Sequence, residues 1–409
     1  MSDTSHSTAA EGVPGLAVGH AAAGVGRLSF GIGAAVLPLV QAQRALGADA
    51  EIWSCDDPAE APDLCRRYGL PDDRFATFPV FGPRRYGWSY TLLRAAPAAA
   101  RFAVLHQHGM WTGVSRFCNR WRSAWRRPTV VAPHGSLAAV ALQRSRWKKW
   151  LALRAYQRSN LTGAACLHAL SETEAQQCRD FGLRGPVAVI PNGVSRAWLE
   201  STGAGERFRR HFGLPDDRRL ALFLGRVTPI KGLSRLIDAV ASCTTQRSDW
   251  LVLIAGPDEF GHLDELRGQV ARLQLEAWVR FVGPLYDPLR RDAFAAASLF
   301  LLPSYSEASP IAAYEAMGAG LPLLTTTAAP FPTLGERGCG WWAPNDTPGI
   351  AAALAEALAR PPQELAAMGG RARELVETTY TWEIAARKTL ALYHWLLGEA
   401  PQPPFVLLS

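Results

Sequence analysis

The chain has 409 residues, 48% of them hydrophobic, and a formal net charge of +7. This length favours two domains, and a mean hydropathy of −0.02 is typical of an enzyme-sized globular protein. The seven cysteines are scattered without a C-x-x-C pair, which argues for a reducing compartment and against a disulfide or zinc framework. The first dozen residues show no export signal and no stretch predicts a membrane span, so a cytoplasmic protein is expected.

The positive charge is concentrated in one part of the first half. Sixteen Lys and Arg residues and no Asp or Glu lie between Arg74 and Ser171. Within this part, cations alternate with tryptophan in the segments 116–127 and 144–150, a pattern that suits an anionic membrane surface at the inner face of the cytoplasmic membrane. A solvated basic face whose tryptophans turn into the core is the alternative. Nucleic acid is not expected as a partner because no nucleic-acid module is visible.

The first half of the chain alternates between predicted strands and helices. Strands are predicted at 16–18, 50–54, 103–106, 129–132, 166–169 and 187–190. Helices are predicted at 34–46, after glycine-rich turns, and at 172–181. Such alternation predicts a parallel sheet with helices on both faces.

The same pattern restarts after a polar stretch around 195–205, which is the expected domain boundary. Strands are predicted at 220–224, 250–255, 279–282, 299–302 and 321–325. Helices are predicted at 233–242, 264–273, 289–297, 348–358, 363–376 and 381–397. We therefore expect an α/β protein with two doubly wound, Rossmann-like domains that face each other across a ligand-binding cleft.

Two glutamates lie close together where a predicted strand gives way to a helix. Pro310 suits the first turn of that helix, so Glu307 is expected in the loop before it and Glu315 inside it. The carboxyl end of a strand in an open α/β sheet is where ligands bind, and the free N–H groups of a helix start favour phosphate. The segment therefore predicts a site for a polyhydroxylated, anionic ligand. An ordinary loop glutamate and an ordinary helix glutamate are the alternative.

Arg226 and Lys231 follow the predicted strand 220–224. Cations in this place can neutralise a diphosphate without a metal and stabilise it as a leaving group. No D-x-D pattern indicates a metal site here, so metal-independent chemistry is expected. Solvated surface cations are the alternative.

Three histidines lie at predicted strand ends. His134 stands between a proline and a glycine after the strand 129–132, and His106 and His108 follow another strand and are expected to line the cleft on the acceptor side. Gly31 and Gly33 precede a helix, but they do not complete a G-x-G-x-x-G motif, so a nicotinamide dehydrogenase fits poorly.

Taken in order, these pieces resemble a retaining glycosyltransferase of GT-B fold and family 4, of the bacterial lipopolysaccharide or exopolysaccharide type. The resemblance rests on Pro133-His134-Gly135, Pro191-Asn192-Gly193, Gly225-Arg226, Lys231-Gly232, Gly283-Pro284 and Glu315-Ala316-Met317. It implies an acceptor-side domain at 14–198 and a donor-binding domain at 205–380, and we expect a last helix at 381–398 that packs back onto the first domain.

The resemblance also implies the reaction and the residues that carry it. A sugar would pass from a UDP- or GDP-sugar to a glycan or lipid-linked acceptor, with no further cofactor and no metal. The implied catalytic residues are His134, Glu307, Arg226 and Lys231. The implied donor-binding residues are Glu315, Ser309, Pro310, Ile311, Gly31, Gly33 and Gly283. The sequence departs from the family at Ala308-Ser309-Pro310, where Gly-Phe-Gly is common.

Two alternatives remain at this point. One is another GT-B reaction on a nucleotide sugar, such as epimerisation or phosphorolysis. The other is a scaffold that binds a nucleotide sugar without turnover. Nucleotide binding followed by a donor-turnover assay separates these alternatives from glycosyl transfer.

Overall fold

The computed structural model describes residues 15–26, 30–200, 203–243 and 249–408. The chain divides into two compact units: the first runs to Pro191 and resumes at Trp382, and the second is Asn192–Thr381. This division falls before the polar stretch around 195–205 that was expected to separate the domains. The first dozen residues, in which no export signal is expected, lie outside the described part, as does residue 14, the expected start of the first domain.

The first unit contains an eight-stranded sheet. Its order is β14-β7-β6-β5-β4-β1-β2-β3, and all neighbours pair in parallel except β14 with β7. The bounds are β1 Ala17–Ala22, β2 Asp49–Ser54, β3 Phe75–Thr77, β4 Val104–His108, β5 Thr129–Ala132, β6 Cys166–Ala169, β7 Val187–Val189 and β14 Val406–Leu407. The short β3 and the antiparallel β14 were not predicted from the sequence, because neither forms a long apolar run.

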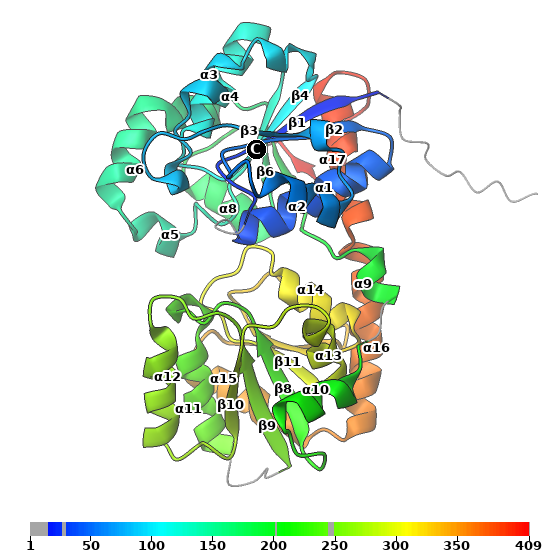
Figure 1. The fold of residues 1–409 in the computed structure, drawn as a ribbon. Coiled ribbons are helices and arrows are strands. Elements are labelled where there is room, and N and C mark those ends of the chain that lie inside the picture. Colours follow the sequence, from blue (N-terminus) through cyan, green and yellow to red (C-terminus); the bar gives the residue numbers. More distant parts are fainter. Residues whose placement is uncertain (1–14, 27–29, 201–202, 244–248, 409) are drawn as a thin grey trace, which may run out of the picture. The chain divides into compact units, whose positions relative to one another are not determined.

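Helices lie on both faces of this sheet (Figure 1). Their bounds are α1 Phe30–Ala45, α2 Ala61–Tyr68, α3 Tyr90–Arg94, α4 Val114–Trp125, α5 Ala139–Gln143, α6 Arg146–Ala152, α7 Arg158–Thr162, α8 Glu172–Asp180 and α17 Trp382–Leu396. The last of these, α17, packs against α1 and is tied to it through a hydrogen bond from Gln43 to Thr389. The end of the chain therefore completes the first unit.

The second unit contains a six-stranded, fully parallel sheet of order β10-β9-β8-β11-β12-β13. The bounds are β8 Arg219–Leu224, β9 Trp250–Ala255, β10 Val279–Gly283, β11 Leu299–Leu302, β12 Leu323–Thr326 and β13 Gly340–Ala343. These strands are nearly continuous apolar runs because helices cover both of their faces. The strand order reverses between β8 and β11, which makes this the switch point where doubly wound sheets bind ligands.

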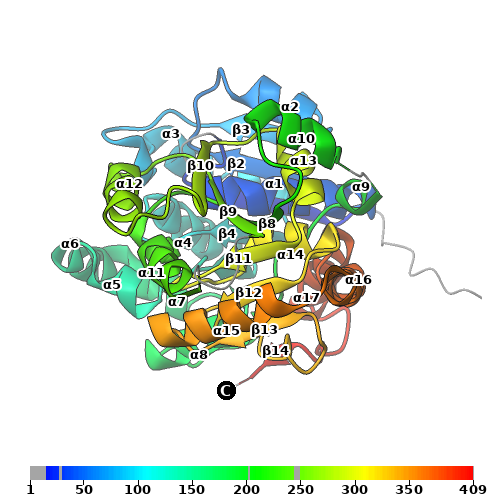
Figure 2. The same cartoon turned by 90° about the horizontal axis from the view of Figure 1, so that it is seen from below.

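The helices of the second unit bury its sheet. Their bounds are α9 Arg196–Glu200, α10 Gly205–Phe212, α11 Leu233–Cys243, α12 His262–Arg272, α13 Leu289–Ala296, α14 Ile311–Gly318, α15 Thr347–Ala359 and α16 Pro362–Thr379. Figures 1 and 2 show α11 and α12 on one side of the sheet and α13 and α14 on the other. The segments by which the chain enters and leaves this unit lie side by side, because Val194 and Thr381 form a parallel β-bridge. The predicted α/β class with two doubly wound sheets is confirmed.

None of the helices in the described ranges has the length and apolar character that crossing a membrane requires. All seven cysteines are buried and unpaired.

Candidate active site

At the switch point of the second unit, a cation that follows β8 lies beside a carboxylate that follows β11. Lys231 follows β8 and Glu307 follows β11, and their Nζ and Oε1 atoms lie 2.7 Å apart. Ser304 donates a hydrogen bond to the same carboxylate oxygen at 2.5 Å. The pair is largely buried, since the two side chains are 18% and 9% exposed. The structure therefore brings together two predicted residues that lie 76 positions apart.

A glycine allows the two loops to approach each other. Gly232 adopts a φ of +68°, and a Cβ added to it would lie 2.0 Å from the carbonyl oxygen of Pro303. No side chain fits in this space. Gly232 thus lets the loop after β8 lie directly against the loop after β11, which holds Lys231 beside Glu307.

The N-terminus of α14 lies in the same region. Pro310 was expected in the first turn of the helix, but α14 begins at Ile311 and Pro310 immediately precedes it. Ser309 is fixed from outside the loop, because its Oγ accepts a hydrogen bond from the backbone N–H of Asn192 and its carbonyl accepts one from the side chain of Asn192. Among the hydrogen bonds of the described residues, the backbone N–H groups of Ser309 and Ile311 have no acceptor. These two groups can therefore donate to an anionic ligand.

Glu315 lies inside α14 and forms an ion pair with Arg290 of α13. Burial raises the pKa of the Glu315 carboxyl to about 7, although the charge and hydrogen bond of Arg290 act in the opposite direction. Trp198 donates a hydrogen bond to the Glu315 carbonyl and so anchors the same turn. Arg290 was not identified from the sequence, because only the packing of α13 beside α14 makes it a partner of Glu315.

Arg226 is the most exposed of the expected donor-site cations. Its Nη1 lies 2.7 Å from both carboxylate oxygens of Glu259, and its side chain is 45% exposed. Glu259 is a second residue that the sequence analysis did not single out. Gly283, at the end of β10, accepts a backbone hydrogen bond from Gly256, at the end of β9. Both glycines thus lie at the same carboxyl edge as Arg226.

His134 lies at the corresponding edge of the first unit, after β5. It has a φ of +52°, which is uncommon for a residue other than glycine. The loop is held by the buried carboxylate of Glu174, which accepts hydrogen bonds from the backbone N–H groups of Gly135 at 2.5 Å and Leu170 at 2.7 Å. Burial raises the pKa of Glu174, while these N–H groups act in the opposite direction. Glu174 is therefore the residue that fixes the His134 turn.

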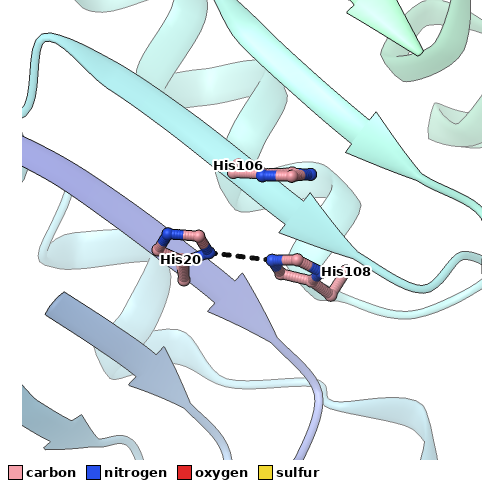
Figure 3. Close-up of side chains that lie close together, drawn as sticks. All are labelled: His20, His106 and His108. Carbon is pink, nitrogen blue, oxygen red and sulfur yellow. Dashed lines mark hydrogen bonds between the residues drawn. The ribbon is translucent and has the colours of Figure 1, made fainter. Parts of the chain in front are cut away.

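The expectation that His106 and His108 line a cleft is corrected by the structure. Both side chains are buried, at 0% and 2% exposure. They were expected at a strand end, but β4 continues through His108 and directs both imidazoles to one covered face of the sheet. They lie with His20 of β1 in a group that could geometrically hold a metal ion (Figure 3).

The description of Gly31 and Gly33 as a loop before the helix is also corrected. Both lie in the first turn of α1, which begins at Phe30. A Cβ on Gly33 would lie 2.0 Å from the carbonyl oxygen of Val25, whereas nothing lies within 4 Å of the same position on Gly31. Gly33 therefore has a packing reason to be glycine.

The two basic, tryptophan-containing segments differ in exposure. In the segment 116–127, Trp121 is fully buried, as the alternative of tryptophans turned into the core expects, whereas Trp125 is 37% exposed. In the segment 144–150, Trp147 and Trp150 are 65% and 51% exposed. Residues of α4, α6 and the loop before α3 surround a hollow of about 820 Å³, lined by five cations and no carboxylate. We call this the basic hollow: its charged and aromatic lining consists of Arg85, Tyr86, Trp88, Trp111, Arg116, Arg144, Trp147, Lys148, Lys149 and Tyr156.

Two family models match the chain, one in each half. The model described as "Glycosyl transferase 4-like domain" matches residues 30–193, and the model described as "Glycosyl transferases group 1" matches residues 205–375. The second match contains Lys231, Glu307 and Glu315.

Individual proteins resemble the chain to different extents. The GDP-mannose:cellobiosyl-diphosphopolyprenol alpha-mannosyltransferase of Komagataeibacter xylinus is 27% identical over 388 residues, which is 90% of this chain and 91% of that protein. The D-inositol 3-phosphate glycosyltransferase of Streptomyces avermitilis is 31% identical over 218 residues, 51% of this chain and 47% of that protein. The chain spans about half the length of the first curated relatives that it matches.

A solved structure shares the fold. The structure of HepE from Anabaena in complex with UDP-glucose superposes with a TM-score of 0.73 at 18% identity, over 94% of this chain and 100% of that one.

Proposed function

The chain belongs to the GT-B glycosyltransferases of family 4, and we propose that it transfers a sugar from a UDP- or GDP-sugar to a glycan or lipid-linked acceptor with retention of the anomeric configuration. Its relatives include enzymes of surface-polysaccharide synthesis, and we place its reaction in such a pathway. HepE is described with UDP-glucose and the Komagataeibacter relative with GDP-mannose, which supports a nucleotide-sugar donor without choosing the base.

The Lys231–Glu307 pair at the switch point is the observation that carries this proposal. A nucleotide sugar offers a diphosphate, ribose hydroxyls and sugar hydroxyls. Lys231 and the free N–H groups at the start of α14 suit the diphosphate, and the acceptor-only carboxylate of Glu307 suits sugar hydroxyls. The carboxylate of Glu315, which pairs with Arg290, can accept hydrogen bonds from the ribose diol in the same way.

The residues of this site act by positioning and charge. As the bond between the sugar and the diphosphate breaks, negative charge grows on the phosphate oxygens, and Arg226 and Lys231 stabilise it. We propose that this cationic stabilisation takes the place of a metal. His134 holds a donor-sugar hydroxyl, and the departing phosphate accepts the proton of the attacking hydroxyl on the same face, which gives retention.

We further propose that the basic hollow of the first unit receives the acceptor or the membrane that carries it. One relative acts, by its name, on a diphosphopolyprenol-linked sugar, which combines an anionic diphosphate with an apolar chain. Five cations and the exposed Trp147 suit such an amphiphile or an anionic membrane surface at the cytoplasmic face. His106 and His108 are not part of this proposal, because both are buried.

Nucleotide titration tests the donor site. Lys231→Ala is expected to weaken UDP or GDP binding, measured by calorimetry, by roughly 10-fold or more, because a charge-assisted hydrogen bond contributes about 1.5–3 kcal/mol. Arg280→Ala is the matched control, since it removes an exposed cation of the same unit whose partners are the carbonyls of Phe212 and Gly213. Unchanged affinity in Lys231→Ala, or equal losses in both variants, would remove the assignment.

A product assay tests the reaction itself. Time-resolved proton NMR of the first product is expected to show the donor's anomeric configuration. Conversion of the donor without an acceptor would indicate epimerisation, dependence on inorganic phosphate would indicate phosphorolysis, and binding without turnover would indicate a scaffold.

Vesicle co-sedimentation tests the basic hollow. We expect binding to phosphatidylglycerol vesicles at low salt and less binding in Trp147→Ala, which removes the exposed tryptophan of the hollow. Phe260→Ala is the control, because Phe260 is 77% exposed and lies in the second unit. Equal binding of all variants would show that the hollow is not the contact.

A further inference from the structure

Five histidines of the first unit lie within one buried hydrogen-bonded network. His20 on β1 pairs in register with His106 on β4, and His108 lies two residues further along the same strand. These three imidazoles therefore share one face of the sheet, as Figure 3 shows. His168 on β6 and His134 after β5 extend the group. The helices α1 and α17 contribute Gln43, Thr389 and Tyr393 to the same network.

The direction of every hydrogen bond in the first branch follows from one backbone carbonyl. The Thr389 hydroxyl donates to the carbonyl oxygen of Ala386 at 2.9 Å, so its oxygen is the acceptor for the Gln43 side chain at 2.8 Å. The Gln43 amide nitrogen is thus on the Thr389 side, and Gln43 Oε1 faces His20 Nε2 at 2.8 Å. An amide oxygen only accepts, so His20 Nε2 carries the hydrogen.

The same reasoning passes from His20 to His134. A neutral imidazole has one N–H and one lone pair, so His20 Nδ1 is an acceptor. Its partner at 2.9 Å, Nε2 of His108, must then donate. This leaves His108 Nδ1 as the acceptor for Nε2 of His134 at 3.0 Å. His134 therefore carries its hydrogen on Nε2.

A second branch begins at another carbonyl and agrees with the first. His168 Nε2 donates to the carbonyl oxygen of Ile190 at 2.7 Å, so His168 Nδ1 accepts from His106 Nε2 at 3.2 Å. His106 Nδ1 then accepts from the Tyr393 hydroxyl at 2.7 Å. The Tyr393 oxygen in turn accepts the second amide hydrogen of Gln43 at 3.3 Å. Both branches meet at Gln43, and each bond has one donor and one acceptor.

Neutral imidazoles fit the hydrogen bonds of the whole network. Burial lowers the pKa of His20 to about 4 and that of His134 to about 3. A second proton on His20, His106, His108 or His168 would force a neighbouring ring or hydroxyl to change its donor and acceptor roles, whereas Nδ1 of His134 faces no partner among the described residues, so the neutral state of His134 follows from its lowered pKa. The same matching disfavours a metal ion in the His20, His106 and His108 group, because all six ring nitrogens already have partners and an ion would break several of these bonds.

We infer that the branch from Gln43 through His20 and His108 fixes His134 as the neutral Nε2–H tautomer and presents the lone pair of His134 Nδ1 to the ligand. Gln43, His20 and His108 are then positioning residues. Where this inference extends to the ligand it rests on the proposed function: His134 accepts a hydrogen bond from a donor-sugar hydroxyl and does not donate one. The tautomer itself does not depend on that function.

Long-range proton–nitrogen NMR correlations of the full-length protein, labelled with ¹⁵N-histidine, test the tautomer directly. The chain has nine histidines, so His134 can be identified by comparison with His134→Asn. The expected spectrum shows a protonated Nε2 and an unprotonated Nδ1 for His134 near pH 7. A protonated Nδ1 in the unaltered protein would overturn the inference, whatever the variants do.

Three variants test the branch. His20→Phe removes the acceptor for His108, so we expect a mixture of His134 tautomers and a rise in donor KM of roughly two- to fivefold, because only the competent fraction binds. His168→Phe is the matched control, because it removes an equally buried histidine from the other branch and is expected to leave His134 unchanged. His20→Gln keeps an acceptor toward His108 and a donor toward Gln43, and is expected to restore the tautomer.

The outcomes separate the two proposals. If His20→Phe changes the His134 tautomer but not the donor KM, the network inference holds and the role of His134 at the donor fails. If the His134 tautomer is the same in His20→Phe, or changes equally in His168→Phe, the branch does not set it and the inference is refuted.

Discussion

Replacing Glu315 with glutamine is expected to stabilise the second unit at neutral and alkaline pH. Burial raises the pKa of this carboxyl from 4.5 to about 7. The folded protein therefore keeps a proton that the unfolded chain has already released, and stability is lost as the pH rises from about 4.5 through about 7. At about 1.36 kcal/mol per pH unit, this difference amounts to about 3 kcal/mol as an upper value. Glutamine avoids the cost of ionisation and still offers Arg290 an acceptor.

The assay compares the unfolding free energy of Glu315→Gln with that of the unaltered protein at pH 5 and pH 8. The gain should be small at pH 5, largest at pH 8 and constant above it. Nucleotide affinity should fall most at pH 8, where Glu315 is ionised, because a neutral amide is a weaker partner for a ribose diol than a carboxylate. A stability difference that does not depend on pH would refute the reasoning, because it would mean that Glu315 does not titrate in this window. A gain in stability with unchanged affinity would leave the titration argument intact but remove Glu315 from the donor site.

Three further changes test how the structure holds its loops. Glu174→Gln leaves one of two buried N–H groups, of Gly135 or Leu170, without an acceptor, so it should cost about 1–3 kcal/mol of unfolding free energy and reduce donor turnover. Unchanged turnover would contradict the role of the turn. Asp292 of α13 accepts hydrogen bonds from Arg207 and from the backbone N–H of Ala204. Burial opposes its ionisation, yet these hydrogen bonds lower its pKa, so its stabilising effect is lost as the pH falls. Asp292→Asn should therefore destabilise at pH 7 but not at strongly acidic pH, and an equal deficit at both pH values would contradict this. Gly232→Ala should cost at least about 1 kcal/mol because of its positive φ and should weaken nucleotide binding, whereas intact binding would show that the loop can move without displacing Lys231.

Most strands were predicted because their apolar runs reflect burial on both faces, whereas the short β3, β13 and β14 were missed. The predicted strand 250–255 coincides with β9, Trp250–Ala255. The start of α1 was less accurately predicted, because Gly31 and Gly33 favour a loop by local preference. The close approach of Gly33 to the Val25 carbonyl explains this glycine, and such a contact between distant backbone segments leaves no periodic signal in the sequence.

The partners of the site residues could not be predicted in the same way. Strand ends indicated Lys231, Glu307 and Glu315, but Arg290 and Glu259 become partners only through packing of neighbouring elements. The histidines show the same limit. A lone histidine in a strand has no distinguishing pattern, so His20 and His168 were not singled out. The strand order that places β1 beside β4 is what brings His20 next to His106.

Ion pairing within the second unit gives the proposed donor site a specific electrostatic character. Three cations at its carboxyl edge each have a carboxylate partner: Lys231 with Glu307, Arg226 with Glu259 and Arg290 with Glu315.

An arriving diphosphate therefore exchanges existing ion pairs for new ones and does not fill an unbalanced positive site. Exchange of this kind releases the carboxylates at the moment when the cations turn to phosphate, and a carboxylate freed from its cation is the acceptor that a sugar or ribose hydroxyl needs. In the proposed donor site, phosphate binding would thus be coupled to hydroxyl binding through the Lys231–Glu307 and Arg290–Glu315 pairs. A nucleotide diphosphate that lacks the sugar can engage Lys231 but leaves Glu307 without a hydroxyl partner, which favours the complete donor over its nucleotide product.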